Sequence, residues 1–169
     1  TELSDVIQQL FPPLANEQAT AIDWQKIAVA NAMNKNFTVI AGGPGTGKTY
    51  TVTKLLAALV MLNKITKANV ANHKGLEIAL VAPTGKAAQR LSESIIKAIS
   101  GFSTLISDNI LAAIPTEAKT IHRLLGVIPN SPNFRYNQNN LLSCDVLLID
   151  EVSMVDLPMM AQLMEALGD

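Results

Sequence analysis

The sequence has little cysteine, little charge and no long apolar run, and each of these scarcities excludes some classes of function. The single cysteine, Cys144, excludes an internal disulfide and a cysteine metal cluster, and predicts a reducing, cytoplasmic setting. A net charge of −1 means that any nucleic-acid site must be local. Residues 1–5 lack the basic and apolar regions of a signal peptide, and no run reaches membrane-spanning length, so we expect no membrane partner.

The apolar residues, 49 % of the 169 present, fall into runs that alternate with helical patterns. Residues 37–41, 78–82 and 145–150 read as buried strands, which predicts an α/β fold with a parallel sheet and helices on both faces. Ligands are then expected at the carboxyl ends of the strands. Residues 1–17 read as a lead-in segment, residues 18–34 as a helix and residues 127–143 as a long loop. The aromatic side chains of Trp24 and Phe37 are expected in or near the core.

One glycine-rich segment carries the strongest signal. It fits the pattern G-x-x-x-x-G-K-[ST] of phosphate-binding loops and lies between an expected strand and an expected helix. Its backbone N–H groups are suited to binding phosphates. Lys48 is suited to placing a catalytic charge on the β- and γ-phosphates, and the Thr49 hydroxyl is suited to binding Mg²⁺. The alternative is an ordinary glycine-rich turn. The predicted nucleotide-binding residues are Gly42, Gly43, Pro44, Gly45, Thr46, Gly47, Lys48, Thr49 and Tyr50.

The expected strand at 145–150 ends in one acid and is followed by a second, and the two complete the predicted nucleotide chemistry. Asp150 is suited to hold Mg²⁺, and Glu151 to activate the attacking water as a general base. The alternative is a solvated strand end. No Asn-Lys-x-Asp guanine-binding pattern is present, so ATP is the expected nucleotide. Gln25 offers an amide for the adenine edge. The alternative, which the residue alone favours, is a surface helix position, and Gln18 is a rival for the adenine role.

Two further polar segments begin helices. Pro83, Thr84, Gly85 and Lys86 offer backbone N–H groups, a hydroxyl and an amine, which form a phosphate site separate from the nucleotide's. Thr120 and His122 lie within one turn and suit phosphate or base contacts. In both cases the alternative is a simple helix cap.

The four segments in this order resemble superfamily 1B DNA helicases, most closely the RecD-like members. The segments are Gly-Gly-Pro-Gly-Thr-Gly-Lys-Thr, Ala-Pro-Thr-Gly-Lys-Ala-Ala, Thr-Ile-His-Arg-Leu-Leu-Gly and Asp-Glu-Val-Ser-Met. The resemblance implies that residues 18–169 are the N-terminal part of a RecA-like motor domain 1 with motifs Q, I, Ia, Ib and II. It implies that Gln25 reads adenine, and that Pro83 to Lys86, Thr120 and His122 contact single-stranded DNA.

The resemblance also implies an activity and partners. Members of this family are ATP- and Mg²⁺-dependent 5′–3′ helicases, and the RecD-like subunit of exodeoxyribonuclease V works with RecB and RecC in double-strand break repair and DNA degradation. The alternatives are an ATPase switch or a docking module that does not move on DNA.

The chain ends where motif III of the family would begin. We therefore expect the second RecA-like domain and its arginine finger to be missing, and the piece alone to hydrolyse ATP barely. Unpaired strand edges would then leave it incompletely ordered or self-associating.

Overall fold

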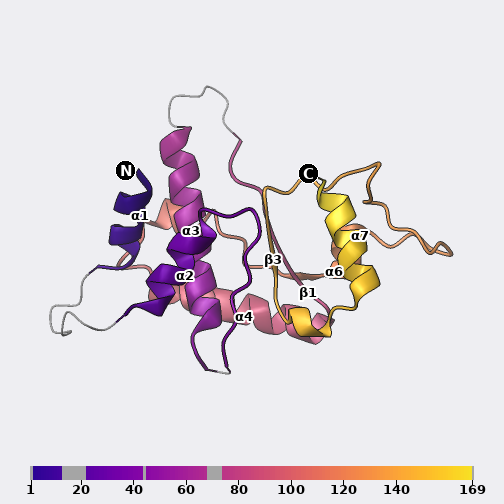
Figure 1. Ribbon diagram of the computed structural model, residues 1–169, viewed down its shortest axis with the longest axis horizontal. Coiled ribbons are helices and arrows are strands. Elements are labelled where there is room, and N and C mark those ends of the chain that lie inside the picture. The colour runs from indigo at the N-terminus through magenta and orange to yellow at the C-terminus, as the bar shows by residue number, and fades with distance from the viewer. Residues whose placement is uncertain (1, 13–21, 44, 68–73, 169) are drawn as a thin grey trace. The chain divides into compact units, whose positions relative to one another are not determined.

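The computed structural model describes residues 2–12, 22–43, 45–67 and 74–168. They form two compact units, and each is considered by itself (Figure 1). The first unit is Thr1–Gly75 with Ser94–Ile114, and the second is Leu76–Glu93 with Pro115–Asp169. No helix of the described part of the chain has both the length and the hydrophobicity needed to cross a bilayer.

The first unit is helical and is built around α3 (Lys48–Thr66). The helices α1 (Glu2–Leu10), α2 (Trp24–Ala32) and α5 (Asp108–Leu111) pack against it. Because neighbours lie on several sides, α3 buries side chains around most of its circumference rather than along one apolar face. The lead-in, for which no element was expected, contains α1, whose Val6, Ile7 and Leu10 are buried.

A lysine enclosed by aromatic rings joins three parts of the first unit. The Lys54 side chain on α3 is only 8 % exposed, and its Nζ lies 4.0 Å from the ring centroid of Phe11, 5.2 Å from that of Tyr50 and 6.0 Å from that of Phe102. Burial lowers the pKa of Lys54, and the nearby charge of Asp23 opposes this shift. Cation–π attraction of this kind offsets part of the cost of burying the ammonium group.

Two expectations for the first unit were wrong. Residues 37–41 do not form a strand, and Phe37 and Val39 are 69 % and 72 % exposed. Apolar character alone does not make a strand, and among the described residues this segment has no backbone ladder partner. Trp24 is also exposed, at 71 %, because it is the first residue of α2 and not an inward position.

The helix expected over residues 18–34 begins at Trp24, where the Asp23 carboxylate accepts a hydrogen bond from the Lys26 N–H at 3.0 Å. An N-cap of this kind fixes the start of a helix. Gln18, with the rest of residues 13–21, lies outside the described residues.

The second unit contains a parallel sheet in the order β2-β1-β3. Its strands are β1 (Ile78–Ala82), β2 (Lys119–Thr120) and β3 (Val146–Ile149). The strands expected at 78–82 and 145–150 are therefore present. The third strand of the sheet is the two-residue segment 119–120. It was not recognised because two residues carry no periodicity.

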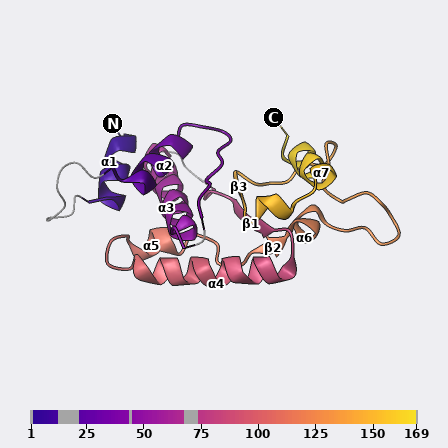
Figure 2. The same ribbon diagram turned by 60° about the horizontal axis from the view of Figure 1, so that its bottom comes forward.

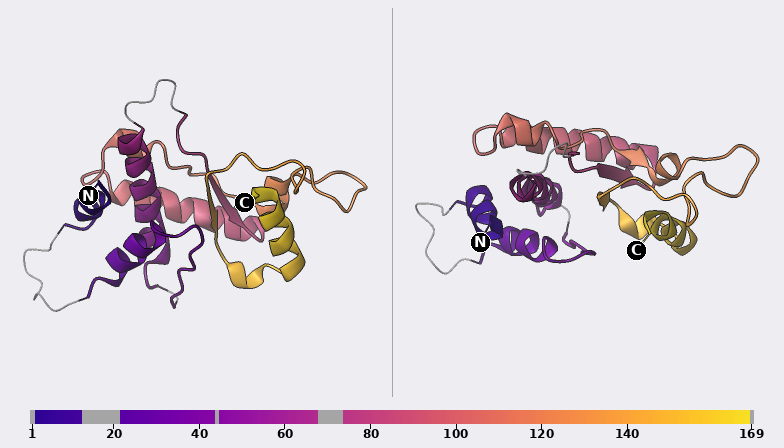
Figure 3. Two further views of the ribbon diagram at one scale, coloured as in Figure 1. Left: turned by 45° about the horizontal axis from the view of Figure 1, so that its top comes forward. Right: turned by 90° about the horizontal axis from the view of Figure 1, so that it is seen from above.

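Helices lie on both sides of this sheet, so the predicted α/β fold with a parallel sheet is confirmed. The helices α6 (Ile121–Leu125) and α7 (Leu157–Leu167) share a core with β1, and a 3₁₀ helix, η1 (Val152–Met154), precedes α7. The first half of α4 (Gly85–Gly101) lies on the side away from α7 (Figures 2 and 3). The core side chains are Val81, Ile121, Leu125, Leu163 and Ala166.

Replacing Phe102 tests the packing of the first unit. Its side chain is fully buried, and its ring lies 4.6 Å from that of Tyr50. We expect Phe102→Ala to lower the free energy of unfolding by about 3–5 kcal/mol in denaturant titrations, because it leaves a cavity. Ile96→Ala, in the helix α4 that ends just before Phe102, is the control. Its side chain is 53 % exposed, so the substitution should change the free energy of unfolding by less than about 0.5 kcal/mol. Equal losses for the two variants would contradict the packing.

Candidate functional site

The glycine-rich loop of the first unit turns sharply into α3. Gly45 and Gly47 have φ angles of 76° and 77°, in the left-handed region that glycine adopts without strain. Gly47 is the N-cap of α3, so the free N–H groups of the first helical turn face the loop. Thr46 Oγ1 donates to the Gly43 carbonyl at 2.9 Å and closes the loop. Pro44 lies outside the described residues.

Lys48 is folded onto the loop that it follows. Its Nζ donates to the carbonyl oxygens of Gly42 at 2.7 Å and Gly43 at 2.8 Å. An ammonium group carries three donors, and these two bonds hold it over the loop. The amine therefore lies where a phosphate cradled by the loop would meet it.

Thr49 and Tyr50 follow on the first turn of α3, and they face different surroundings. Thr49 is half-buried, and its carbonyl accepts a hydrogen bond from Thr53 Oγ1 at 2.7 Å. The Tyr50 ring packs on Phe102, toward the aromatic rings around Lys54. These contacts give Tyr50 a packing role, while the Thr49 hydroxyl remains a candidate ligand for Mg²⁺.

Gln25 comes close to the glycine loop. A methyl group added at Gly47 would lie 3.0 Å from Gln25 Nε2, so the amide lies against the end of the loop. Two interpretations of Gln25 were left open, a surface residue or an adenine contact. Its half-buried position beside Gly47 favours the second.

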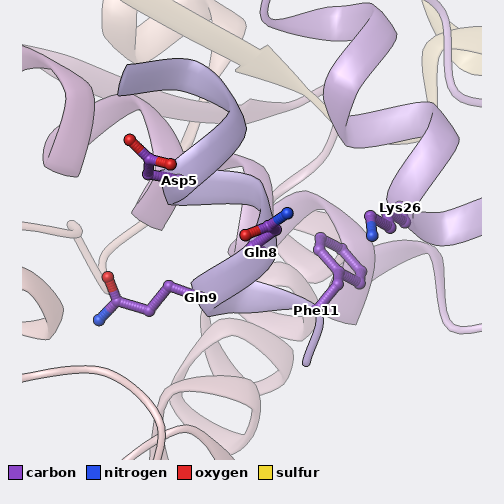
Figure 4. Close-up of a pocket in the computed structure, with 5 residues that line it drawn as sticks. All are labelled: Asp5, Gln8, Gln9, Phe11 and Lys26. Carbon is purple, nitrogen blue, oxygen red and sulfur yellow. The ribbon is translucent and has the colours of Figure 1, made fainter. Parts of the chain in front are cut away.

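A hollow on the same unit lies outside the residues predicted from sequence (Figure 4). Its lining is polar apart from one aromatic ring, and Lys26, next to Gln25 in sequence, is part of it. The lining residues are Asp5, Gln8, Gln9, Phe11 and Lys26. None of them was a predicted site residue, and the hollow is separate from the glycine loop.

Asp150 and Glu151 leave the carboxyl end of β3 in the second unit. The Asp150 N–H donates to the Val81 carbonyl at 2.9 Å, which extends the pairing with β1 by one residue. Glu151 has φ of 54°, a left-handed conformation that is costly for any residue except glycine and uncommon outside Asn and Asp. Such strain accumulates at functional positions, so it favours a catalytic role over a solvated strand end. No group of three or more potential metal ligands occurs among the described residues.

Thr84 and Thr120 cap helices at the same edge. Thr84 Oγ1 accepts from the Ala87 N–H at 3.2 Å at the start of α4, and Thr120 Oγ1 accepts from the Arg123 N–H at 3.2 Å at the start of α6. Both capping interpretations are therefore correct. Because a hydroxyl that accepts a hydrogen bond still has a proton to donate, each Thr can also bind a phosphate oxygen. Gly85 and Lys86 are exposed in the first turn of α4, and Pro83 precedes it.

Strand pairing brings these positions together. Ala82 is paired with Thr120 across β1 and β2, and Val81 with Ile149 across β1 and β3. Thr84 and Asp150 therefore follow β1 and β3, and Thr120 ends β2, so all three lie at the carboxyl edge where ligands were expected. His122 is the exposed second residue of α6, and its ring lies 5.8 Å from that of Phe134.

A glycine loop that caps a helix, followed by a parallel sheet with acids at its carboxyl edge, defines a P-loop nucleoside-triphosphatase. A family model described as "AAA domain" matches residues 25–169, and the chain belongs to this family.

The expected resemblance to RecD-like proteins is confirmed by the chain's relatives. It is 47 % identical over 169 residues to the RecBCD enzyme subunit RecD of Haemophilus influenzae, and 39 % identical over 165 residues to that of Buchnera aphidicola. It is 36 % identical over 153 residues to the ATP-dependent RecD2 DNA helicase of Deinococcus radiodurans. These matches cover 98 %, 98 % and 90 % of the chain, but only 24 %, 25 % and 16 % of the relatives, so the chain spans about a quarter or less of their length.

The contact between Gln25 and the loop can be tested with two glycines. Gly45→Ala and Gly47→Ala should each cost about 1–2 kcal/mol of stability, because alanine is strained at positive φ. Only at Gly47 would the new methyl also meet Gln25 Nε2, since nothing lies within 4 Å at Gly45. A double-mutant cycle with Gln25→Ala, measured by unfolding, should therefore show coupling with Gly47 and none with Gly45. Equal coupling at the two positions would contradict this contact.

The strain at Glu151 can be tested through its effect on stability. Glu151→Gly should raise the free energy of unfolding by about 0.5–1 kcal/mol. Glycine adopts the left-handed conformation without a steric penalty, and the larger backbone entropy that glycine loses on folding cancels part of this gain. Glu151→Ala keeps the penalty and should leave stability within about 0.5 kcal/mol. Thermal unfolding that ranks Ala above Gly would contradict the strained backbone.

Proposed function

We propose that this chain is the part of an ATP-dependent 5′–3′ DNA helicase that binds the nucleotide and makes the first contacts with single-stranded DNA. Residues 18–169 would form the N-terminal part of a RecA-like motor domain 1. The observation that carries the proposal is the order of the four segments, combined with the phosphate loop over which Lys48 is held.

The first unit fits a nucleotide. The phosphates would lie against the N–H groups at the start of α3, and Lys48 would exchange the Gly42 and Gly43 carbonyls for phosphate oxygens. That exchange places a full positive charge beside the charge that develops during hydrolysis. Gln25, beside Gly47, would bind the adenine edge through its amide.

Each unit, taken by itself, offers an oxygen donor suited to a magnesium ion. These donors are the Thr49 hydroxyl in the first unit and the Asp150 carboxylate in the second, and a bound Mg²⁺ would neutralise phosphate charge. Glu151 would take the proton of the attacking water. Glu151 follows Asp150 in sequence and has a left-handed backbone as the N-cap residue of η1.

The carboxyl edge of the second unit fits the backbone of a single DNA strand. It combines the hydroxyls of Thr84 and Thr120, the free N–H groups at the start of α4, the amine of Lys86 and the imidazole of His122. Since the chain as a whole has a net charge of −1, DNA affinity would depend on these local donors.

The partners are proposed from the names of the relatives. Two of the relatives reported above are named as RecD subunits of RecBCD enzyme, and these are more similar to the chain than the RecD2 helicase is. We infer a motor subunit that works with RecB and RecC in double-strand break repair and DNA degradation. A free helicase is the second possibility, and a lack of co-purification with RecB and RecC would favour it.

Turnover of ATP by the full-length protein, with and without single-stranded DNA, tests the function. We expect strong stimulation by DNA, and a loss of about 10²–10³-fold in Lys48→Ala, because one charged donor to the transition state is removed. Glu151→Gln should abolish turnover while ATP still binds, since only the base is lost. Turnover that ignores DNA would reject the helicase and favour a nucleotide switch.

A further inference from the structure

The helix that carries His122 is too short to be stable by itself. The helix α6 has five residues, and isolated helices of that length do not persist in water. Ile121 and Leu125 anchor it in the core, at 1 % and 0 % exposed, whereas His122 and Arg123 are exposed. The direction of the His122 side chain therefore depends on a neighbour.

The segment after α6 returns to the helix and supplies that neighbour. Gly126, with φ of 74°, reverses the chain, and the Arg135 N–H donates back to its carbonyl at 2.8 Å. The Tyr136 N–H donates to the Leu125 carbonyl at 2.9 Å, and Val127 bridges Phe134 in antiparallel fashion. Residues 126–136 are thus fastened to the end of α6 by backbone bonds.

This return places Phe134 against His122. The two rings are 5.8 Å apart at 70°, the edge-to-face geometry that aromatic pairs prefer. Phe134 is itself half-buried against the core of Val81, Ile121, Leu125, Leu163 and Ala166, and its carbonyl accepts from Asn137 Nδ2 at 3.1 Å. A ring fixed by the core therefore packs against an imidazole that is otherwise free in solvent.

We propose that Phe134 is a positioning residue, which fixes the rotamer of His122 so that the imidazole meets a base or phosphate of single-stranded DNA. The inference rests on the proposed function of the carboxyl edge. Phe134 would not touch the DNA, and its whole effect would pass through His122. If the His122 rotamer were not fixed, DNA binding would have to order it, and the lost side-chain entropy would weaken binding. A rotamer that Phe134 already fixes avoids this loss.

The test uses the full-length protein and a fluorescein-labelled oligothymidylate. Phe134→Leu keeps an apolar side chain at this position but removes the ring. It should weaken DNA binding about five- to tenfold, the loss expected when one ring contact with the DNA is misplaced. Phe134→Tyr keeps the ring and should restore wild-type affinity. ATP affinity without DNA should be the same for all three proteins, since the glycine loop belongs to the other unit.

Two readouts separate positioning from ordinary stability. In protein labelled with ¹³C at histidine, the His122 ring resonance, identified by its loss in His122→Ala, should move in Phe134→Leu and return in Phe134→Tyr. In the His122→Ala background, Phe134→Leu should cause no further loss of DNA affinity. An unmoved resonance, or additive losses, would overturn the proposal. A wild-type protein without affinity for the oligothymidylate would overturn the proposed function, and this would be evident before any variant is made.

Discussion

The pairing of β1 with a strand on either side is the constraint on which the second unit depends. β1 is the middle strand, and its register with β2 and β3 decides which residues of distant segments become neighbours. Residues 82, 120 and 149 are far apart in sequence, yet each is followed by a functional segment at the same edge. Because side chains alternate along a strand, a slip of one residue in either pairing would turn these segments away from each other.

The sequence was most informative where local chemistry decides the structure. The glycine loop, the strand at 78–82, the cap at Thr120 and the helix after Gly85 follow from residue type and spacing over a few positions. The carboxyl edge could be predicted too, since parallel strands place their ends together. The sequence did not predict the features that depend on contacts with a distant segment of the chain.

Three particular residues illustrate that limit. Lys54 looks like a solvated helix residue until Phe11 and Phe102, from opposite ends of the unit's sequence, cover it. Val39 looks like the centre of a strand, but a strand exists only where another one accepts its hydrogen bonds. Phe134 lies in an Asn- and Pro-rich segment that predicts a featureless loop, and its ordered return to α6 depends on two backbone bonds that no composition reveals.

The bonds from Lys48 to the Gly42 and Gly43 carbonyls have a consequence for how a nucleotide would enter. Neutral oxygens act as temporary ligands of the amine, so the side chain is already ordered before any phosphate arrives, and its rotational entropy is not lost a second time. The incoming phosphate has to displace two carbonyls, which then need other donors. Anion binding at this loop would therefore be a ligand exchange, and it would discriminate against weakly charged anions that cannot outcompete a pair of backbone carbonyls.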